Sequence, residues 1–208
     1  MKRAALGVRM HSGWGVLVGV SGDANSVEVQ VRRHIVTMNP TIAGAKQPYH
    51  HAASLTLQNG LQDAEKYLDD CAAASVSLAM MAVSDVVREL KERKFRISGC
   101  AVLLAAGRPL PPLAKILASH PLIHAAEGEF FRNAVSKACE RLEIPVAAMR
   151  ERDLAEQARA KFGNAANRLQ EAISSLGKSI GPPWTKDHKA AALAALLVLK
   201  RPDHPQNL

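Results

Sequence analysis

The sequence predicts a protein of the α/β class, in which helices flank a mixed sheet. Short apolar segments of β type open the chain and are separated by turns. Further on, two apolar runs at residues 97–106 and 144–149 enclose a helical segment. A strand, a helix and a second strand in this order form a parallel crossover, which is right-handed in nearly all proteins. We therefore expect a three-stranded antiparallel meander followed by parallel strands.

The opening segments fit such a meander. Residues 4–20 are typical of a strand, a short bend and a second strand, whose valines alternate with glycine and leucine. A strand of this composition is buried on both faces. After a turn at residues 21–26, residues 27–38 alternate apolar and polar side chains, which predicts a third strand with one exposed face.

An irregular loop is expected at residues 39–59, because Pro40, Gly44 and Pro48 interrupt the pattern there. The loop contains Tyr49, His50 and His51 as one group. A polar loop and a set of ligands both explain such a group, and long ordered loops are often functional.

A long helix is expected at residues 61–93, where apolar side chains recur with helical spacing. Unbroken, it would be about 50 Å long at ~1.5 Å per residue, so two helices that meet near Ser75 are an alternative. Its Ala-rich part at residues 72–82 could serve as the interface of a homo-oligomer.

The second half of the chain is mainly helical. Asp153 is expected to cap one of its helices, and Gly177 to end the same helix. We expect these helical segments at residues 113–119, 121–142, 154–176 and 184–199.

Composition favours one globular domain at residues 1–200, followed by a loose tail at residues 201–208. The chain has 208 residues, of which 48% are hydrophobic and 22% charged. Only 4% are aromatic, so the core must consist of Ala, Val, Leu and Ile.

Cysteine usage and hydropathy point to the cytoplasm. Cys71, Cys100 and Cys139 are odd in number and lie in apolar segments without metal-type spacing. We expect reduced core thiols. No apolar run reaches the roughly 18 residues that span a bilayer, and Lys2 and Arg3 are not followed by a signal-peptide core. A membrane is therefore not an expected partner.

The net charge of +8 permits attraction to nucleic acid. The basic residues are spread along the chain rather than massed in one tail. Solubility explains such a spread as well as a nucleic-acid partner does.

Chemistry-bearing residues concentrate at residues 120–132, which read HPLIHAAEGEFFR. If a helix begins at Pro121, His124 and Glu127 lie three residues apart and share a face. A hydrogen-bonded pair at the start of a helix explains them, and so does a metal or catalytic site.

Glu129 and Arg132 form a second such pair. A local ion pair explains them, and the planar fork of Arg132 could instead receive a phosphate. Gly128 costs a helix about 1 kcal/mol relative to alanine, which indicates a close approach to this position.

Residues 11–14 offer donors at a bend between strands. His11 and Ser12 could bind a ligand there, and a strand bend capped by a buried Trp14 is the alternative. The GxxxxGK[ST] and GxGxxG motifs and paired CxxC are absent from the sequence, which argues against a P-loop kinase, a Rossmann domain and a zinc ribbon.

In element order, the chain resembles the ribonuclease H-like superfamily, and within it the Holliday junction resolvases. Three stretches carry the resemblance: GVRMHSGWGVLV, IPVAAMRERDL and TKDHKAAALAALLVL. The resemblance implies a ribonuclease H-like mixed sheet with flanking helices. It also implies two divalent cations held by carboxylates of the first strand, the fourth strand and the final helix.

Asp187 matches the carboxylate of the final helix in that family. The first strand instead carries Arg9, Met10 and His11, and the fourth strand ends with Ala105, Ala106 and Gly107. A replacement set for one divalent metal ion would consist of His11, His124, Glu127 and Asp187. By ligand type this set suits Mn, Fe or Zn, and Mg or Mn is the expected cofactor.

The resulting hypothesis is a metal-dependent phosphodiesterase or nuclease that acts on nucleic acid. His124, Glu127 and Asp187 would be catalytic, while Arg132 and Lys189 would hold phosphate. The alternative is a non-catalytic ribonuclease H-like module that binds a small anion or a protein partner.

Overall fold

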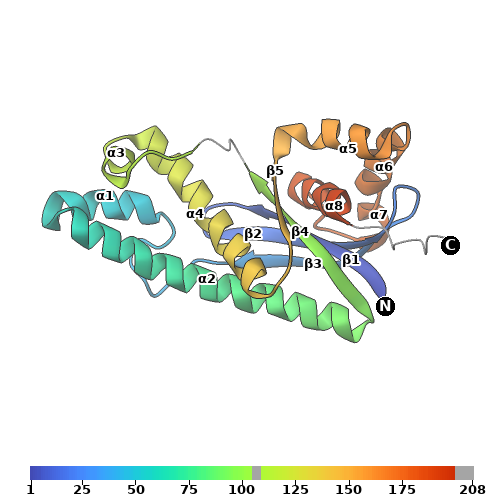
Figure 1. The fold of residues 1–208 in the computed structure, drawn as a ribbon, viewed down its shortest axis with the longest axis horizontal. Coiled ribbons are helices and arrows are strands. Elements are labelled where there is room, and N and C mark those ends of the chain that lie inside the picture. Colours follow the sequence, from blue (N-terminus) through green and yellow to red (C-terminus); the bar gives the residue numbers. More distant parts are fainter. Residues whose placement is uncertain (105–108, 200–208) are drawn as a thin grey trace, which may run out of the picture.

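Strand β1 (Lys2–Met10) is buried along both faces, and its side chains divide between two cores. Leu6 and Val8 enter one core, whereas Ala5 enters the other. Successive side chains of a strand point to opposite faces, so a strand between two helical layers must be apolar throughout. The computed structural model in which this arrangement is seen describes residues 1–104 and 109–199 (Figure 1).

The sheet has five strands and mixed topology. Strands β1 and β2 are antiparallel, as are β2 and β3, whereas β1 and β4 are parallel, as are β4 and β5. The predicted meander and the predicted parallel strands are thus confirmed. In spatial order the strands are β3 (Val27–Val36), β2 (Trp14–Gly22), β1, β4 (Phe95–Leu104) and β5 (Val146–Arg150).

Helices cover both faces of the sheet. One face packs on α2 (Leu61–Glu92) and α4 (His120–Arg141), whose Val83 and Phe131 enter the first core. The second core is completed by the other face of the sheet and the C-terminal helices. These are α5 (Leu154–Phe162), α6 (Ala165–Ser175), α7 (Gly177–Ile180) and α8 (Lys186–Val198), preceded by the 3-10 turn η1 (Glu151–Asp153).

Strand β1 and helix α8 approach each other unusually closely. A Cβ atom at Gly7 would lie only 1.9 Å from the carbonyl oxygen of Ala191. The two backbones therefore touch at a position that only glycine can occupy. This contact fixes the start of α8 relative to the end of β1.

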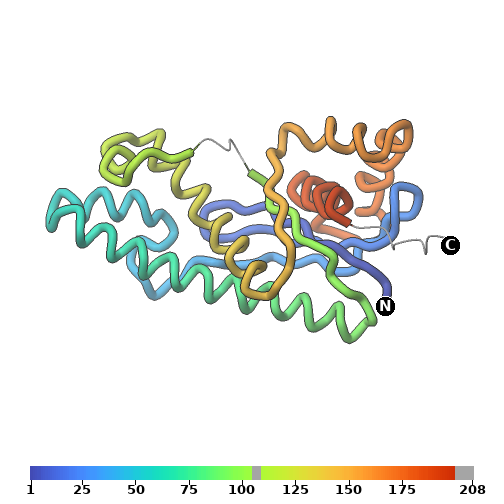
Figure 2. The backbone as a smooth tube through the Cα atoms, viewed as in Figure 1, coloured from blue at the N-terminus to red at the C-terminus, as the bar shows by residue number. Residues whose placement is uncertain are grey.

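A helical lobe extends beyond the sheet (Figure 1). It consists of α1 (Pro48–Asn59), α3 (Leu113–Leu117) and the adjoining ends of α2 and α4. Figure 2 shows α1 and α2 as an antiparallel pair at the far end from the N-terminus. Small apolar clusters around Ala52, Leu68 and Ile123 hold the lobe together.

For the first half, one expectation is wrong, and the long helix at residues 61–93 is confirmed against the alternative of two helices. The predicted loop at 39–59 contains helix α1, which begins with Pro48 in its first turn and buries Ala52 against its neighbours. Its amphipathic pattern is weak, so periodicity did not reveal it. Helix α2 runs without a break through Ser75, which is only 3% exposed and packs inside the structure.

The predicted helix at 154–176 is also divided. Gly163 has a φ of +55° and separates α5 from α6. The Asp153 side chain does not cap α5; its carboxylate lies 2.6 Å from Nε of Arg150 instead. The fourth-strand positions Ala105, Ala106 and Gly107, and the predicted tail 201–208, lie outside the described residues.

Helix α2 is long and apolar enough to cross a membrane by length and composition. A third of its most apolar window is buried, and Val76, Val83 and Leu90 pack in the first core. Core helices of globular proteins commonly have these properties. In the predicted oligomer interface at residues 72–82, Val76 and Ala79 pack in the first core, whereas Met81 is 63% exposed. The homo-oligomer itself stays a prediction.

The three cysteines are free and buried, as expected.

Candidate functional site

Four side chains meet at one edge of the sheet, and we call them the edge cluster: Arg9, His11, Glu151 and Asp187. Arg9 is near the end of β1, and His11 follows that strand. Glu151 opens η1 directly after β5, and Asp187 is in the first turn of α8. The carboxyl ends of parallel strands in an open α/β sheet form the usual ligand-binding edge. The cluster therefore occupies the place where a ligand is expected.

Arg9 joins both carboxylates of the edge cluster. Its Nη1 lies 3.1 Å from Oδ1 of Asp187, and its Nε lies 2.9 Å from Oε2 of Glu151. The side chains of Arg9 and Asp187 are 23% and 20% exposed. Partly buried ion pairs of this kind are screened less by solvent than surface pairs.

His11 is held by the same carboxylate. Its Nε2 is 2.8 Å from Oδ2 of Asp187 and 2.7 Å from Nη1 of Arg9. A guanidinium can only donate and a carboxylate can only accept, so one ring nitrogen cannot hydrogen-bond both. We assign the proton to Nε2, which then donates to Asp187.

The expected pair of divalent cations does not fit the edge cluster. Such cations need carboxylate oxygens that are free to coordinate. Here the Arg9 guanidinium stands at the first-strand position and forms ion pairs with both Asp187 and Glu151. In the folded protein the carboxylates of the edge cluster are engaged in ion pairs with side chains.

Three rings stack beside the edge cluster. The ring centroids of His11 and Trp14 are 4.3 Å apart, and those of Trp14 and His34 are 5.1 Å apart, with nearly parallel planes. Trp14 is 36% exposed. The alternative of a buried Trp14 that caps the bend is therefore wrong. The indole ring instead stacks between the imidazole rings of His11 and His34 at the surface.

Arg132 lies in the middle of α4 with its guanidinium folded over Gly128. A Cβ atom at Gly128 would come within 3.0 Å of Nη2 and 3.2 Å of Nη1. The close approach predicted at this glycine is thus the side chain of Arg132. Nε of Arg132 is buried without a hydrogen-bond partner, and no ion pair with Glu129 forms between these described residues.

Two effects lower the pKa of Arg132. Burial is the larger one, and the positive charge of Arg9 adds to it, while Glu129 acts in the opposite direction. The two guanidiniums are therefore near enough for their charges to repel. A negatively charged ligand between them would relieve this repulsion.

A second group lies in the helical lobe, and we call it the histidine trio: His50, His120 and His124. One ligand atom from each ring lies within 4.8 Å of the others. The carboxylate of Glu127 is 2.8 Å from Nδ1 of His50 and 3.3 Å from the His50 backbone nitrogen. Glu127 therefore pairs with His50 on α1 and not, as the helix-start interpretation expected, with His124.

Sequence reasoning missed His120 and left His50 undecided. The spacing His120–His124, one helical turn, was a signal for a shared face. His50 could not be added, because residues 39–59 were expected to be a loop. Only the packing of α1 on α4 brings it to the other two rings.

The residues predicted as one metal set fall into two places. His11 contacts Asp187 at the edge of the sheet, while His124 and Glu127 belong with the lobe. Figure 1 shows the first turns of α4 well away from α8. Lys189 is two residues after Asp187 on α8 and is partly exposed, and the described structure shows no contact between it and the histidine trio.

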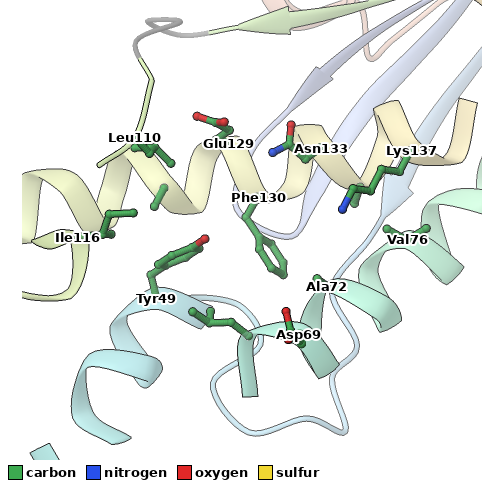
Figure 3. A pocket seen from close by; sticks show the side chains of 13 residues that line it. Tyr49, Asp69, Ala72, Val76, Leu110, Ile116, Glu129, Phe130, Asn133 and Lys137 are labelled. Atoms are coloured by element: carbon green, nitrogen blue, oxygen red, sulfur yellow. The ribbon is translucent and has the colours of Figure 1, made fainter. Parts of the chain in front are cut away.

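A cavity of about 340 Å³ opens between α1, α2 and α4 (Figure 3). Phe130 and Val76 provide apolar walls, and Lys137 brings a positive charge. Burial, followed by the nearby Glu129 carboxylate, raises the pKa of Tyr49 at its rim. Sequence reasoning singled out Tyr49 and Glu129 among its lining residues, but it did not bring them together in one cavity.

The comparisons with known proteins agree on the fold. No protein-family model matches the chain, and no curated protein matches its sequence. Two solved structures of Thermus thermophilus RuvC are similar. One, in complex with a Holliday junction substrate, has a TM-score of 0.52 at 14% identity and covers 94% of this chain and 91% of that chain. The other has a TM-score of 0.51 at 15% identity, with coverage of 93% and 91%.

At this identity the similarity concerns the fold alone. It extends over nearly the whole of both chains, and it agrees with the mixed strand order β3-β2-β1-β4-β5. The chain therefore has the ribonuclease H-like fold, in the form found in the Holliday junction resolvase RuvC.

Proposed function

We propose that the protein binds nucleic acid through its phosphate backbone at the edge cluster. One observation carries the proposal. Arg132 has a half-buried guanidinium whose Nε has no hydrogen-bond partner and which forms no ion pair in the described structure, although the Glu129 carboxylate acts on it more strongly than the charge of Arg9 does. A positive group held in this way is stabilised by a phosphate, whose oxygens match the planar fork of arginine.

The surroundings of the edge support the same ligand. Lys186 and Lys189 are exposed or partly exposed on α8, and the whole chain carries a net charge of +8. His34 ends the ring stack on the exposed side and can offer a face to a base. The similar RuvC structure was solved with a Holliday junction, so a branched DNA is the first ligand to test.

The experiment is a fluorescence-anisotropy titration of a labelled four-way DNA junction, with a duplex and a single strand of equal length beside it. Wild-type protein should bind with an affinity that falls steeply with salt. Arg132→Gln should weaken binding roughly tenfold and reduce the salt slope by about 1, since one phosphate contact is lost.

Arg88→Gln is the matched control. Arg88 is 69% exposed on α2, and its ion pair among the described residues is with Asp85, three residues before it. This variant removes one positive charge without touching the edge, so its affinity should stay within about twofold of wild type. Equal losses in the two variants, or a flat salt response of the wild type, would overturn the proposal. A flat response would favour the small-anion or protein-binding alternative.

Metal-dependent cleavage of the bound nucleic acid is the second candidate. It is favoured by the presence of His124 in a group with the spacing of metal ligands, next to Glu127. With Mn²⁺, Mg²⁺ or Zn²⁺ present in separate reactions, an end-labelled junction should then be cut by wild type, and the products should disappear in His124→Ala. If the junction stays intact after incubation with a tenfold excess of wild-type protein, the cleavage proposal is rejected and the binding proposal remains.

A cytoplasmic location fits both candidates, because the free cysteines are buried thiols and nucleic acid is the proposed partner.

A further inference from the structure

We infer that the histidine trio is a binding site for a transition-metal ion of the Zn²⁺ type, which links α1 to α4. His120 and His124 project from consecutive turns of α4, and their ring centroids are 4.4 Å apart. His50 arrives from α1, with its ring centroid 5.3 Å from that of His120 and 4.8 Å from that of His124. Three imidazoles from two helices thus surround one point.

The distances fit a site that closes on an ion. The ligand atoms lie within 4.8 Å of one another. In a tetrahedral zinc site with bonds of about 2.1 Å, they would be about 3.4 Å apart. His120 and His124 are exposed and can change rotamer, so the contraction needs no movement of the backbone.

Glu127 supplies the independent evidence. Its side chain is only 3% exposed, and a buried carboxylate is costly unless it has a specific partner. That partner is His50, which donates from Nδ1 and from its backbone nitrogen to the same oxygen. With Nδ1 engaged, the lone pair of His50 is on Nε2. A carboxylate that fixes the tautomer and direction of a ligand histidine is the usual outer shell of a metal site.

The type of ligand selects the type of ion. Imidazole nitrogens suit Zn²⁺, Ni²⁺ and Cu²⁺, whereas Mg²⁺ prefers oxygen. This site therefore differs from the expected set of His11, His124, Glu127 and Asp187 in its residues, since His124 is the one ligand that the two sets share. Three protein ligands at an exposed position leave the fourth place open to water or to a phosphate oxygen.

The test is a titration of Zn²⁺ into metal-stripped protein, in competition with a chromophoric chelator. Wild type should bind one ion with a dissociation constant of micromolar or below. His120→Ala and His124→Ala should each weaken binding at least 100-fold. Glu127→Gln should retain the site but weaken it 10- to 100-fold, because only the outer shell changes.

His51→Ala is the matched control, because His51 is the next residue of α1 and its ring packs on Tyr67 instead. Its zinc affinity should equal that of wild type. Co²⁺ should give the visible absorption of a tetrahedral complex in wild type and in His51→Ala, but not in His120→Ala or His124→Ala. The inference is overturned if wild type binds no zinc at 100 μM, or if His120→Ala and His124→Ala bind it as tightly as wild type.

Thermal unfolding gives a second readout that does not depend on nucleic acid. An ion that bridges α1 and α4 binds only the folded protein, so saturating Zn²⁺ should raise Tm. The rise should be present in His51→Ala and absent in His124→Ala. Because His124 is exposed, its replacement should leave the Tm of the metal-free protein unchanged. Equal rises in all three proteins would place the ion elsewhere.

Discussion

Nη1 of Arg9 lies 3.1 Å from Oδ1 of Asp187, at the strand position where the resemblance to Holliday junction resolvases implied a carboxylate. A positive charge thus stands where the family pattern calls for a negative one. The same guanidinium also contacts Glu151, so one side chain forms ion pairs with both carboxylates of the edge. The position of Arg9 therefore decides whether this edge attracts a phosphate or a metal ion.

Replacing Arg9 with aspartate should exchange these two preferences. Arg9→Asp would place three carboxylates, at positions 9, 151 and 187, around one point. Binding of Mn²⁺ should appear in isothermal titration, while affinity for a four-way junction without metal should fall at least tenfold. Repulsion among the carboxylates should also lower the free energy of unfolding at pH 7 by about 1–2 kcal/mol.

Arg9→Gln is the control for Arg9→Asp, because it removes the positive charge without adding a ligand. It should lose junction affinity but gain no Mn²⁺ binding. Mn²⁺ binding by both variants, or by neither, would contradict the account of the edge given by the Arg9–Asp187 contact.

Gly128→Ala tests the position of the Arg132 guanidinium. The new methyl group would lie 3.0 Å from Nη2, the far end of a flexible side chain, so the guanidinium can move aside. Alanine favours a helix over glycine by about 1 kcal/mol. Urea unfolding should therefore show a gain of about 0.5–1 kcal/mol, while junction affinity falls because the fork has moved.

The double variant Gly128→Ala with Arg132→Gln separates the two effects of the glycine. It should keep the gain in stability and bind the junction no more weakly than Arg132→Gln alone. An additive loss of affinity would mean that Gly128 acts on binding by another route.

The sheet could be predicted from the sequence because its signals are local. Alternating valines and short apolar runs show strands by their period, and a strand, a helix and a strand in succession indicate a parallel pair. Helix α1 gave no such signal. Its helical form depends on burial of Ala52 and Tyr49 against other helices, and tertiary packing outweighed the loop-like composition.

The candidate site was predictable only in part. His124, Glu127, Asp187 and Arg132 were found because their side chains carry chemistry in a short stretch or match a family position. Their partners come from far along the chain: His50 is 77 residues from Glu127, and His11 is 176 residues from Asp187. A sequence without aligned relatives contains no information on such pairs until the fold places them.

Gly7→Ala should prevent the close packing of β1 on α8. Its methyl group would lie 1.9 Å from a backbone oxygen, and the backbone cannot move aside as a side chain can. Urea denaturation should show a loss of about 3 kcal/mol or more. Gly99→Ala in β4 is the control, since its methyl group would meet its nearest atom at 3.3 Å. A loss there as large as at Gly7 would refute a specific backbone contact.

His188 should make stability depend on pH. Its Nδ1 accepts hydrogen bonds from the backbone nitrogen of Thr185 at 3.2 Å and from the Thr185 hydroxyl at 2.8 Å, so the folded protein needs the neutral ring. Burial lowers the pKa of His188, and Arg32 lowers it further, against a smaller opposite effect of Asp187.

Because the folded-state pKa of His188 is lower than the unfolded value of about 6.5, the unfolded chain binds the proton more readily. The stabilisation by the neutral ring is complete above the unfolded-state pKa, and it is lost as the pH falls through the folded-state pKa. Urea unfolding from pH 8 to pH 5 should show this decrease in wild type. At pH 8, His188→Gln should have a free energy of unfolding about 1 kcal/mol below that of wild type, because the helix cap is lost. Toward pH 5 its free energy of unfolding should decrease less steeply than that of wild type. Parallel pH profiles of the two proteins would show that the decrease arises from other groups.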